Sequence, residues 1–104
     1  MSRDMALSRE QVLAMLRSHE QELRRRGVRH AALFGSVARG EATSESDIDV
    51  MIELAPEAEI GLFEYVAIVQ YVAGIFPRRV DIANRSSLKA QVRTSAERDA
   101  VYAF

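Results

Sequence analysis

The hydrophobic and polar positions change period several times along the chain, and each change predicts an element. Near the start, Ser8 and Gln11 have the spacing of a capping box, and apolar residues then recur at helical intervals up to Leu23. This pattern predicts a helix over residues 8–26, which Gly27 would end.

Three short stretches are typical of strands. VRHAALFG and DIDVMIEL predict strands at 28–35 and 47–54, and RRVDIAN predicts a third at 78–84. The apolar stretch over 61–76 is long enough for a helix, and Pro77 ends it. That helix is apolar nearly all round, which is typical of a helix that is either fully buried or covered by a partner protein.

The last segment predicts a third long helix. Ser86 or Ser87 would cap it, and its apolar positions run through Val92 and Ala96 to Val101. Strands that alternate with helices favour an α/β or α+β fold, in which a small mixed sheet is packed by helices. The order of the strands is not determined by this pattern. The chain of 104 residues fits a single domain over 1–104.

Composition narrows the class of protein. There is no cysteine, which excludes disulfides and thiolate metal sites. The charged opening MSRDMALSRE is unlike a signal peptide. The longest apolar stretch is interrupted by Glu64 and Gln70 and falls short of the roughly 20 residues that span a membrane. We therefore expect a cytoplasmic protein that makes no membrane contact.

The net charge of −1 conceals an uneven distribution. Residues 1–40 hold eight arginines and four acids, whereas residues 41–77 hold eight acids and no lysine or arginine. The acidic part is either a solvated surface or, in part, a cation site that faces a basic rim or partner. The arginines at 24–26 suit the end of the first predicted helix and have no aromatic residues between them, so we expect no direct nucleic acid binding.

A glycine and a serine follow the first predicted strand. Gly35 has no Cβ, so a ligand could approach its backbone closely. Ser36 would cap a one-turn helix that Gly40 ends, which would direct free amides and a hydroxyl toward phosphate oxygens. Arg39 could add a charge-assisted hydrogen bond. Alternatively, Ser36 and Gly40 only begin and end this short helix.

Three aspartates suggest a metal site. Asp47 and Asp49 would lie on one face of the second strand, where each carboxylate raises the pKa of the other unless a cation compensates them. Oxygen ligands of this kind select Mg²⁺ or Mn²⁺. Asp81 lies between Val80 and Ile82. It either faces solvent or, if its strand pairs beside the second, joins the other two, and three acids can hold two metal ions.

The order Gly35-Ser36, ten residues, then Asp47-x-Asp49, with an acid in a later strand, resembles the nucleotidyltransferase superfamily that includes DNA polymerase β. The fuller strings GSVARGEATSESDIDVMIEL and RRVDIANRSSL resemble its smallest members. These are the minimal nucleotidyltransferase (MNT) antitoxins, partners of HEPN ribonuclease toxins. Ser44 departs from the family pattern, which has a proline there.

The resemblance implies a polymerase β-like fold and a role for each motif. Asp47 and Asp49 would bind the metal ions and the nucleotide, and Asp81 would complete the site and help to activate the attacking hydroxyl. Gly35 and Ser36 would hold the triphosphate. The implied reaction transfers AMP from ATP to a hydroxyl, for antitoxins a tyrosine of the cognate HEPN toxin, in a hetero-oligomeric complex.

Two other functions remain open from the sequence. The chain could be a binding module that neutralises a toxin by complex formation without catalysis. It could also be a small-molecule nucleotidyltransferase, of the kind that modifies aminoglycosides, although such enzymes usually carry an extra helical domain for the acceptor.

Overall fold

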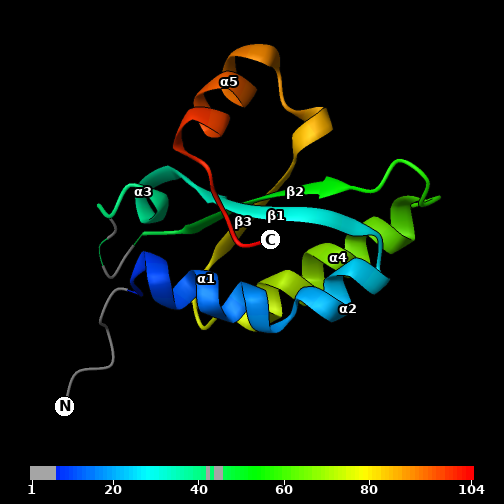
Figure 1. Ribbon diagram of the computed structural model, residues 1–104, viewed down its shortest axis with the longest axis horizontal. Helices are drawn as coiled ribbons and strands as arrows, with labels where there is room; N and C mark the ends of the chain where they lie inside the picture. The colour runs from blue at the N-terminus through cyan, green and yellow to red at the C-terminus, as the bar shows by residue number, and fades with distance from the viewer. Residues whose placement is uncertain (1–6, 42, 44–45) are drawn as a thin grey trace.

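A four-stranded mixed sheet is the centre of the molecule (Figure 1). The computed structural model describes residues 7–41, 43 and 46–104. The strand order is β3-β2-β1-β4. Strand β1 (Val28–Phe34) runs antiparallel to β2 (Ile48–Leu54) and to β4 (Val101–Tyr102), and β3 (Val80–Asn84) runs parallel to β2. The predicted mixed sheet packed by helices is therefore confirmed.

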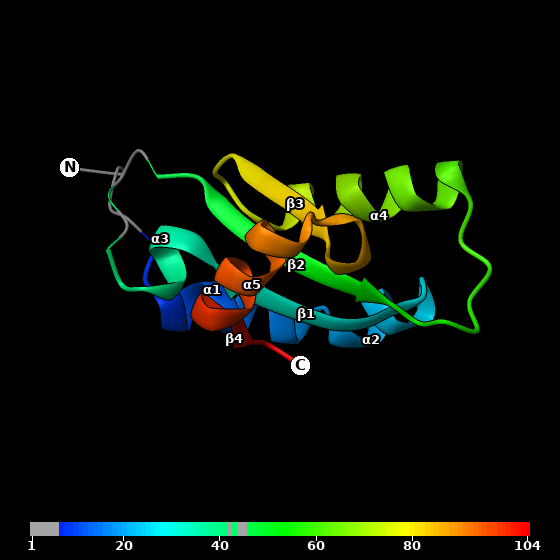
Figure 2. The same ribbon diagram turned by 90° about the horizontal axis from the view of Figure 1, so that it is seen from above.

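The helices lie on both faces of the sheet. Helices α1 (Arg9–Ser18), α2 (Glu20–Arg25) and α4 (Leu62–Ile75) cover one face, and α5 (Ala90–Asp99) lies on the other (Figures 1 and 2). The main core fills the space between the sheet and helices α1, α2 and α4. Its buried members include Val12, Leu16, Leu23, Leu33, Ile48, Val50, Ile52, Ile68 and Val72.

The strand residues that alternate with these core positions point to the opposite face of the sheet, on which α5 lies. Ala32 of β1 and Met51 of β2 form a second, smaller apolar cluster with Ala96 of α5. Because side chains alternate along a strand, Asp49 lies on the same face as Met51, and Phe34 lies on the same face as Ala32. We call this the α5 face of the sheet, and it carries the candidate chemistry.

The first predicted helix is two helices. Ser8 and Gln11 form the predicted capping box, with Gln11 N donating to Ser8 Oγ at 3.1 Å. His19 leaves the helical conformation (φ −109°, ψ 12°), and its N–H bonds Leu16 O, three residues back. The side chains of Ser18 and His19 both reach Met15 O, at 2.7 and 2.9 Å. These local hydrogen bonds compete with the helical ones and divide the element.

The C-terminal prediction is wrong at both ends of the helix. Neither Ser86 nor Ser87 caps α5, because both lie in a 3₁₀ turn, Arg85–Ser87, and α5 begins only at Ala90. The helix ends at Asp99, and Val101 and Tyr102 form strand β4 against β1. Two residues are too few to show an alternating pattern, and Val101 also fits the helical spacing of the apolar positions before it, so the sequence did not predict this strand.

Helix α4 agrees with its predicted span but is buried on one side only. Ile68 and Val72 are buried, whereas Leu62, Phe63 and Val66 near its start are exposed by 73%, 86% and 41%. We call these three residues the α4 patch. Among the residues that the structure describes, no helix is both long and apolar enough to cross a membrane.

The arginines at 24–26 make contacts within the chain. Arg24 pairs with Glu20 at 2.7 Å, and Arg26 pairs with Glu22 at 2.9 Å. The guanidinium of Arg26 also lies 4.5 Å from the centre of the Tyr71 ring, which connects α2 to α4. These side chains therefore support the packing of the helical layer.

Candidate active site

The three aspartates come from two neighbouring strands. Strand β3 pairs with β2 in parallel register, so that Asp81 is the direct partner of Asp49. Asp47 comes two positions before Asp49, immediately ahead of β2. Asp47 and Asp49 are half-buried, and Asp81 is exposed. The third strand therefore pairs beside the second, as the proposed role of Asp81 requires. Asp49 and Asp81 both lie on the α5 face of the sheet.

The electrostatics of Asp49 reflect these neighbours. Burial, followed by the negative charges of Asp81 and Asp47, raises the pKa of the Asp49 carboxyl, while the nearby cation of Arg39 opposes that shift. Even so, over 7–41, 43 and 46–104 no group of three acidic or histidine side chains is arranged as a ready set of metal ligands. The carboxylates are close enough to repel one another but are not gathered around one point.

The raised pKa of Asp49 has a consequence for stability. The folded protein holds this proton more tightly than the unfolded chain, so the contribution of Asp49 is present below its unfolded pKa and is lost as pH rises through its folded pKa. Asp49→Asn cannot titrate. We expect its stability relative to the wild type to increase over that pH window, measured by urea unfolding without metal from about pH 3 to pH 7. A constant difference would contradict the assignment.

Gly35 and Asp49 depend on each other. Gly35 has φ +74°, a conformation that suits glycine, and a Cβ added there would overlap Asp49 Oδ2 and lie 3.1 Å from its Cγ. From the sequence, we expected Gly35 to let a ligand approach the backbone closely. The structure gives a reason within the chain, since the carboxylate of Asp49 occupies that space.

Gly35→Ala should therefore impair both folding and the site. A residue with a side chain costs about 1–2 kcal/mol in the left-handed region, and its Cβ would push the Asp49 carboxylate aside. We expect a lower melting temperature together with weaker binding of Mg²⁺-ATP, measured by thermal shift and calorimetry. Gly74→Ala in α4 is the matched control, because a Cβ there meets nothing within 4 Å. Equal behaviour of the two variants would contradict this view of Gly35.

The turn after β1 is the short helix α3 (Gly35–Ala38). Its N-cap is Phe34, so the expectation that Ser36 caps it is wrong, and Ser36 lies inside its first turn. Gly40 follows with φ +75°, as predicted for the residue that ends the turn. Arg9 of α1 donates to Ala38 O at 3.0 Å and holds α3 against the helical layer.

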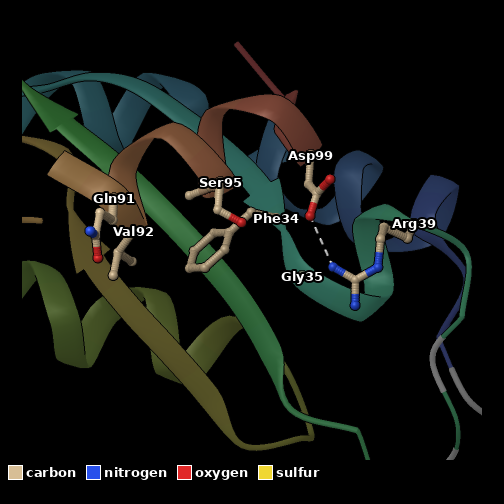
Figure 3. A pocket seen from close by; sticks show the side chains of 8 residues that line it. Phe34, Gly35, Arg39, Gln91, Val92, Ser95 and Asp99 are labelled. Atoms are coloured by element: carbon tan, nitrogen blue, oxygen red, sulfur yellow. Dashed lines mark hydrogen bonds and ion pairs between the residues drawn. The ribbon is translucent and has the colours of Figure 1, made fainter. Parts of the chain in front are cut away.

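Arg39 is engaged by two acids. Its guanidinium pairs with Glu41 and with Asp99, both at 2.9 Å, and the second contact joins α3 to the end of α5 (Figure 3). Sequence reasoning missed Asp99, because an acid in the last turn of a predicted helix carries no motif. It also missed that Arg78 donates to Ser46 O at 2.6 Å, beside Asp47. Ser44 lies outside the described residues.

Comparison with known proteins supports the fold and shows the family of the chain. The family model of the nucleotidyltransferase domain matches residues 16–103. A protein of Thermococcus cleftensis named protein adenylyltransferase MntA is 35% identical over 97 residues, which cover 92% of this chain and 96% of that relative.

Solved structures have the same architecture. One assigned as a minimal nucleotidyltransferase has a TM-score of 0.67 at 29% identity and covers 86% of this chain and 93% of its own. A chain from the complex of a tri-AMPylated Shewanella oneidensis HEPN toxin with an MNT antitoxin has a TM-score of 0.61 at 15% identity, over 88% of this chain and 71% of its own. The chain, with its Gly-Ser and Asp-x-Asp motifs on a mixed sheet, belongs to the nucleotidyltransferase domain family.

Proposed function

We propose that this chain transfers AMP from ATP, with Mg²⁺, to a tyrosine hydroxyl of a cognate HEPN-type ribonuclease toxin and so acts as its antitoxin. The observation that carries the proposal is the pairing of Asp49 with Asp81 on the α5 face, directly beside Gly35. Carboxylates on adjacent strands next to a glycine turn are suited to a polyphosphate and its cations.

We assign the residues the roles that the family resemblance implies. Gly35, Ser36 and Arg39 would bind the β- and γ-phosphates through backbone amides, a hydroxyl and a guanidinium. The acceptor oxygen would attack the α-phosphorus and form a new P–O bond. The bond from that phosphorus to the bridging oxygen would break, and pyrophosphate would leave. Asp81, the most exposed of the three acids, would take the proton of the hydroxyl.

The three aspartates fit a divalent cation. Asp47, Asp49 and Asp81 offer only carboxylate oxygens, and the raised pKa of Asp49 marks a charge that lacks full compensation. These residues would hold Mg²⁺, or Mn²⁺, with two ions in the family arrangement. When bound, such ions neutralise phosphate charge. Because the side chains do not form a ready set of ligands, we expect nucleotide oxygens to complete the coordination.

A protein acceptor is favoured over a small molecule by the comparisons. The relative from Thermococcus cleftensis is named a protein adenylyltransferase, and the Shewanella oneidensis HEPN toxin in the complex with an MNT antitoxin is AMPylated. The Thermococcus cleftensis protein is 35% identical to this chain, whereas the antitoxin complex is matched at 15% identity and supports the proposal only through the shared fold.

Neutralisation by complex formation is the second candidate, and the α4 patch favours it. Leu62, Phe63 and Val66 lie exposed side by side at one end of α4, and Glu57, Glu59 and Glu64 are near them in the chain. Exposed apolar side chains of this size are typical of a protein interface. A partner surface with an apolar centre and a basic rim would complement them.

Intact-mass analysis tests the proposal and separates the two candidates. The product of the neighbouring gene is incubated with this chain, ATP and Mg²⁺, and its mass is measured. One or more added adenylyl groups, absent when ATP is omitted, are expected. Stable complex formation without any change in mass would favour the binding module instead.

A further inference from the structure

Of the three proposed metal ligands, only Asp47 lies outside a strand. Asp49 and Asp81 are held by the backbone hydrogen bonds between β2 and β3, whereas Asp47 comes immediately before β2. A metal site needs its ligands within roughly 0.5 Å of the productive geometry. A contact other than the strand pairing is therefore needed to fix the backbone at position 47.

The residues on both sides of Asp47 are bonded to the segment that enters β3, which runs beside the start of β2 (Figure 2). Nη2 of the Arg78 guanidinium donates a hydrogen bond to Ser46 O at 2.6 Å. On the other side, Ile48 N donates to Arg79 O at 2.9 Å. These two hydrogen bonds anchor the chain before and after Asp47 to the start of the neighbouring strand.

The two hydrogen bonds differ in what the sequence must supply. The bond to Ile48 N uses the backbone carbonyl of residue 79, which any amino acid offers. The bond to Ser46 O uses the half-buried side chain of Arg78, and hydrogen bonds from charged donors are shorter and stronger than neutral ones. The position of Asp47 therefore depends on the identity of residue 78.

The same contact sets the spacing of the acids. Asp81 follows Arg78 by three residues, on the strand that pairs with β2. Because this arginine ties the residue before Asp47 to the start of that strand, Asp47 is held relative to both other acids. Substituting a residue that orients metal ligands in this way typically lowers metal affinity or activity by about 10–100-fold.

We propose that Arg78 is a positioning residue of the active site, and that its hydrogen bond to Ser46 O holds Asp47 where the metal-bound nucleotide requires it. The proposal rests on the proposed function, since Asp47 must be a metal ligand. It adds a side chain that lies outside the Gly-Ser and Asp-x-Asp motifs and that acts on nucleotide binding through Asp47.

Calorimetric titration of ATP in excess Mg²⁺ tests this role without an acceptor protein. Arg78→Met removes the donor but keeps an apolar stem, and we expect it to bind ATP about 10–100-fold more weakly than the wild type. Arg78→Lys keeps a donor and should recover most of that affinity. Arg79→Met is the matched control, because it removes the same charge from an exposed neighbour and retains the carbonyl that bonds Ile48 N. It should bind ATP like the wild type.

A double-mutant cycle with Asp47→Asn separates positioning from a general effect on the fold. Asp47→Asn alone should weaken ATP binding in Mg²⁺. Adding Arg78→Met to it should change the affinity by less than about 2-fold, because the ligand that the arginine orients is already lost. An equal loss in both backgrounds would overturn the action through Asp47, and equal affinities of Arg78→Met and Arg79→Met would overturn the role of Arg78.

Melting temperatures of the metal-free variants show whether each chain is folded. If Arg78→Met does not fold, Arg78→Gln replaces it with the same expected results, because its side chain is two atoms shorter and falls short of Ser46 O. ATP binding that depended on Asp47 but not on Arg78 would overturn only the positioning role. A wild type that bound no ATP in Mg²⁺ would contradict the proposed function itself.

Discussion

Asp49→Asn is expected to lose AMP transfer by a factor of about 100 to 1,000 or more, the range seen when one electrostatic stabiliser of a transition state is removed. Asp49 pairs with Phe34 of β1 on one side and with Asp81 of β3 on the other. Its carboxylate occupies the space that a Cβ at position 35 would fill. Asparagine keeps its shape but removes the charge that a divalent cation requires. The rate would be measured by intact mass, as adenylyl groups added to the product of the neighbouring gene.

The fold should survive that substitution. Burial and two like charges disfavour the ionised carboxyl of Asp49, so the metal-free variant should melt at the wild-type temperature or slightly above it. Glu53→Gln is the matched control, because Glu53 lies four residues along the same strand and on the same face. It should transfer AMP like the wild type. Transfer that persisted in Asp49→Asn would refute the assignment of Asp49 as a metal ligand.

Phe63→Arg is expected to weaken the complex with the HEPN protein by roughly 30-fold or more, which corresponds to the loss of a 2 kcal/mol interface hot spot. Phe63 is 86% exposed, so the substitution leaves the core untouched. A cation at that point would also oppose a partner with a basic rim. Affinity would be measured by calorimetry, with the melting temperature of the free chain as a check on folding.

Gln70→Arg controls for the added charge, since it places the same side chain on another exposed position of α4. It should bind the partner like the wild type. If Phe63→Arg also bound normally, the α4 patch would not be the interface. Transfer measured on the same variants then tells whether docking at this patch precedes modification.

The sequence predicted which acidic residues lie close together better than it predicted where the helices and strands begin and end. Asp47 and Asp49 were assigned to one face by strand alternation, a local rule that holds whatever the tertiary structure. Asp81 needed a condition that no local pattern supplies, namely that its strand lies beside β2, and the structure meets it. The role of Gly35 was predicted only in part, because the contact with Asp49 joins residues fourteen positions apart.

The errors have two physical origins, one local and one long-range. The division at His19 arises from side-chain hydrogen bonds to Met15 O, which override a continuous apolar period. Strand β4 forms because Val101 and Tyr102 meet the free edge of β1, a contact distant in sequence. The contact of Arg39 with Asp99 and the cavity under α5 (Figure 3) depend on where that helix crosses the sheet. None of these long-range contacts leaves a signature in the spacing of residues.

Because Gly35 fits tightly against the Asp49 carboxylate, these two positions of the proposed active site cannot be changed independently. A library randomised at position 35 alone should return glycine even when the screen asks only for a well-folded protein. Larger residues should be tolerated at position 35 once Asp49 is replaced by a smaller residue. Such double variants should lose AMP transfer. Anyone who transplants the unit into another scaffold must carry the turn and the aspartate together.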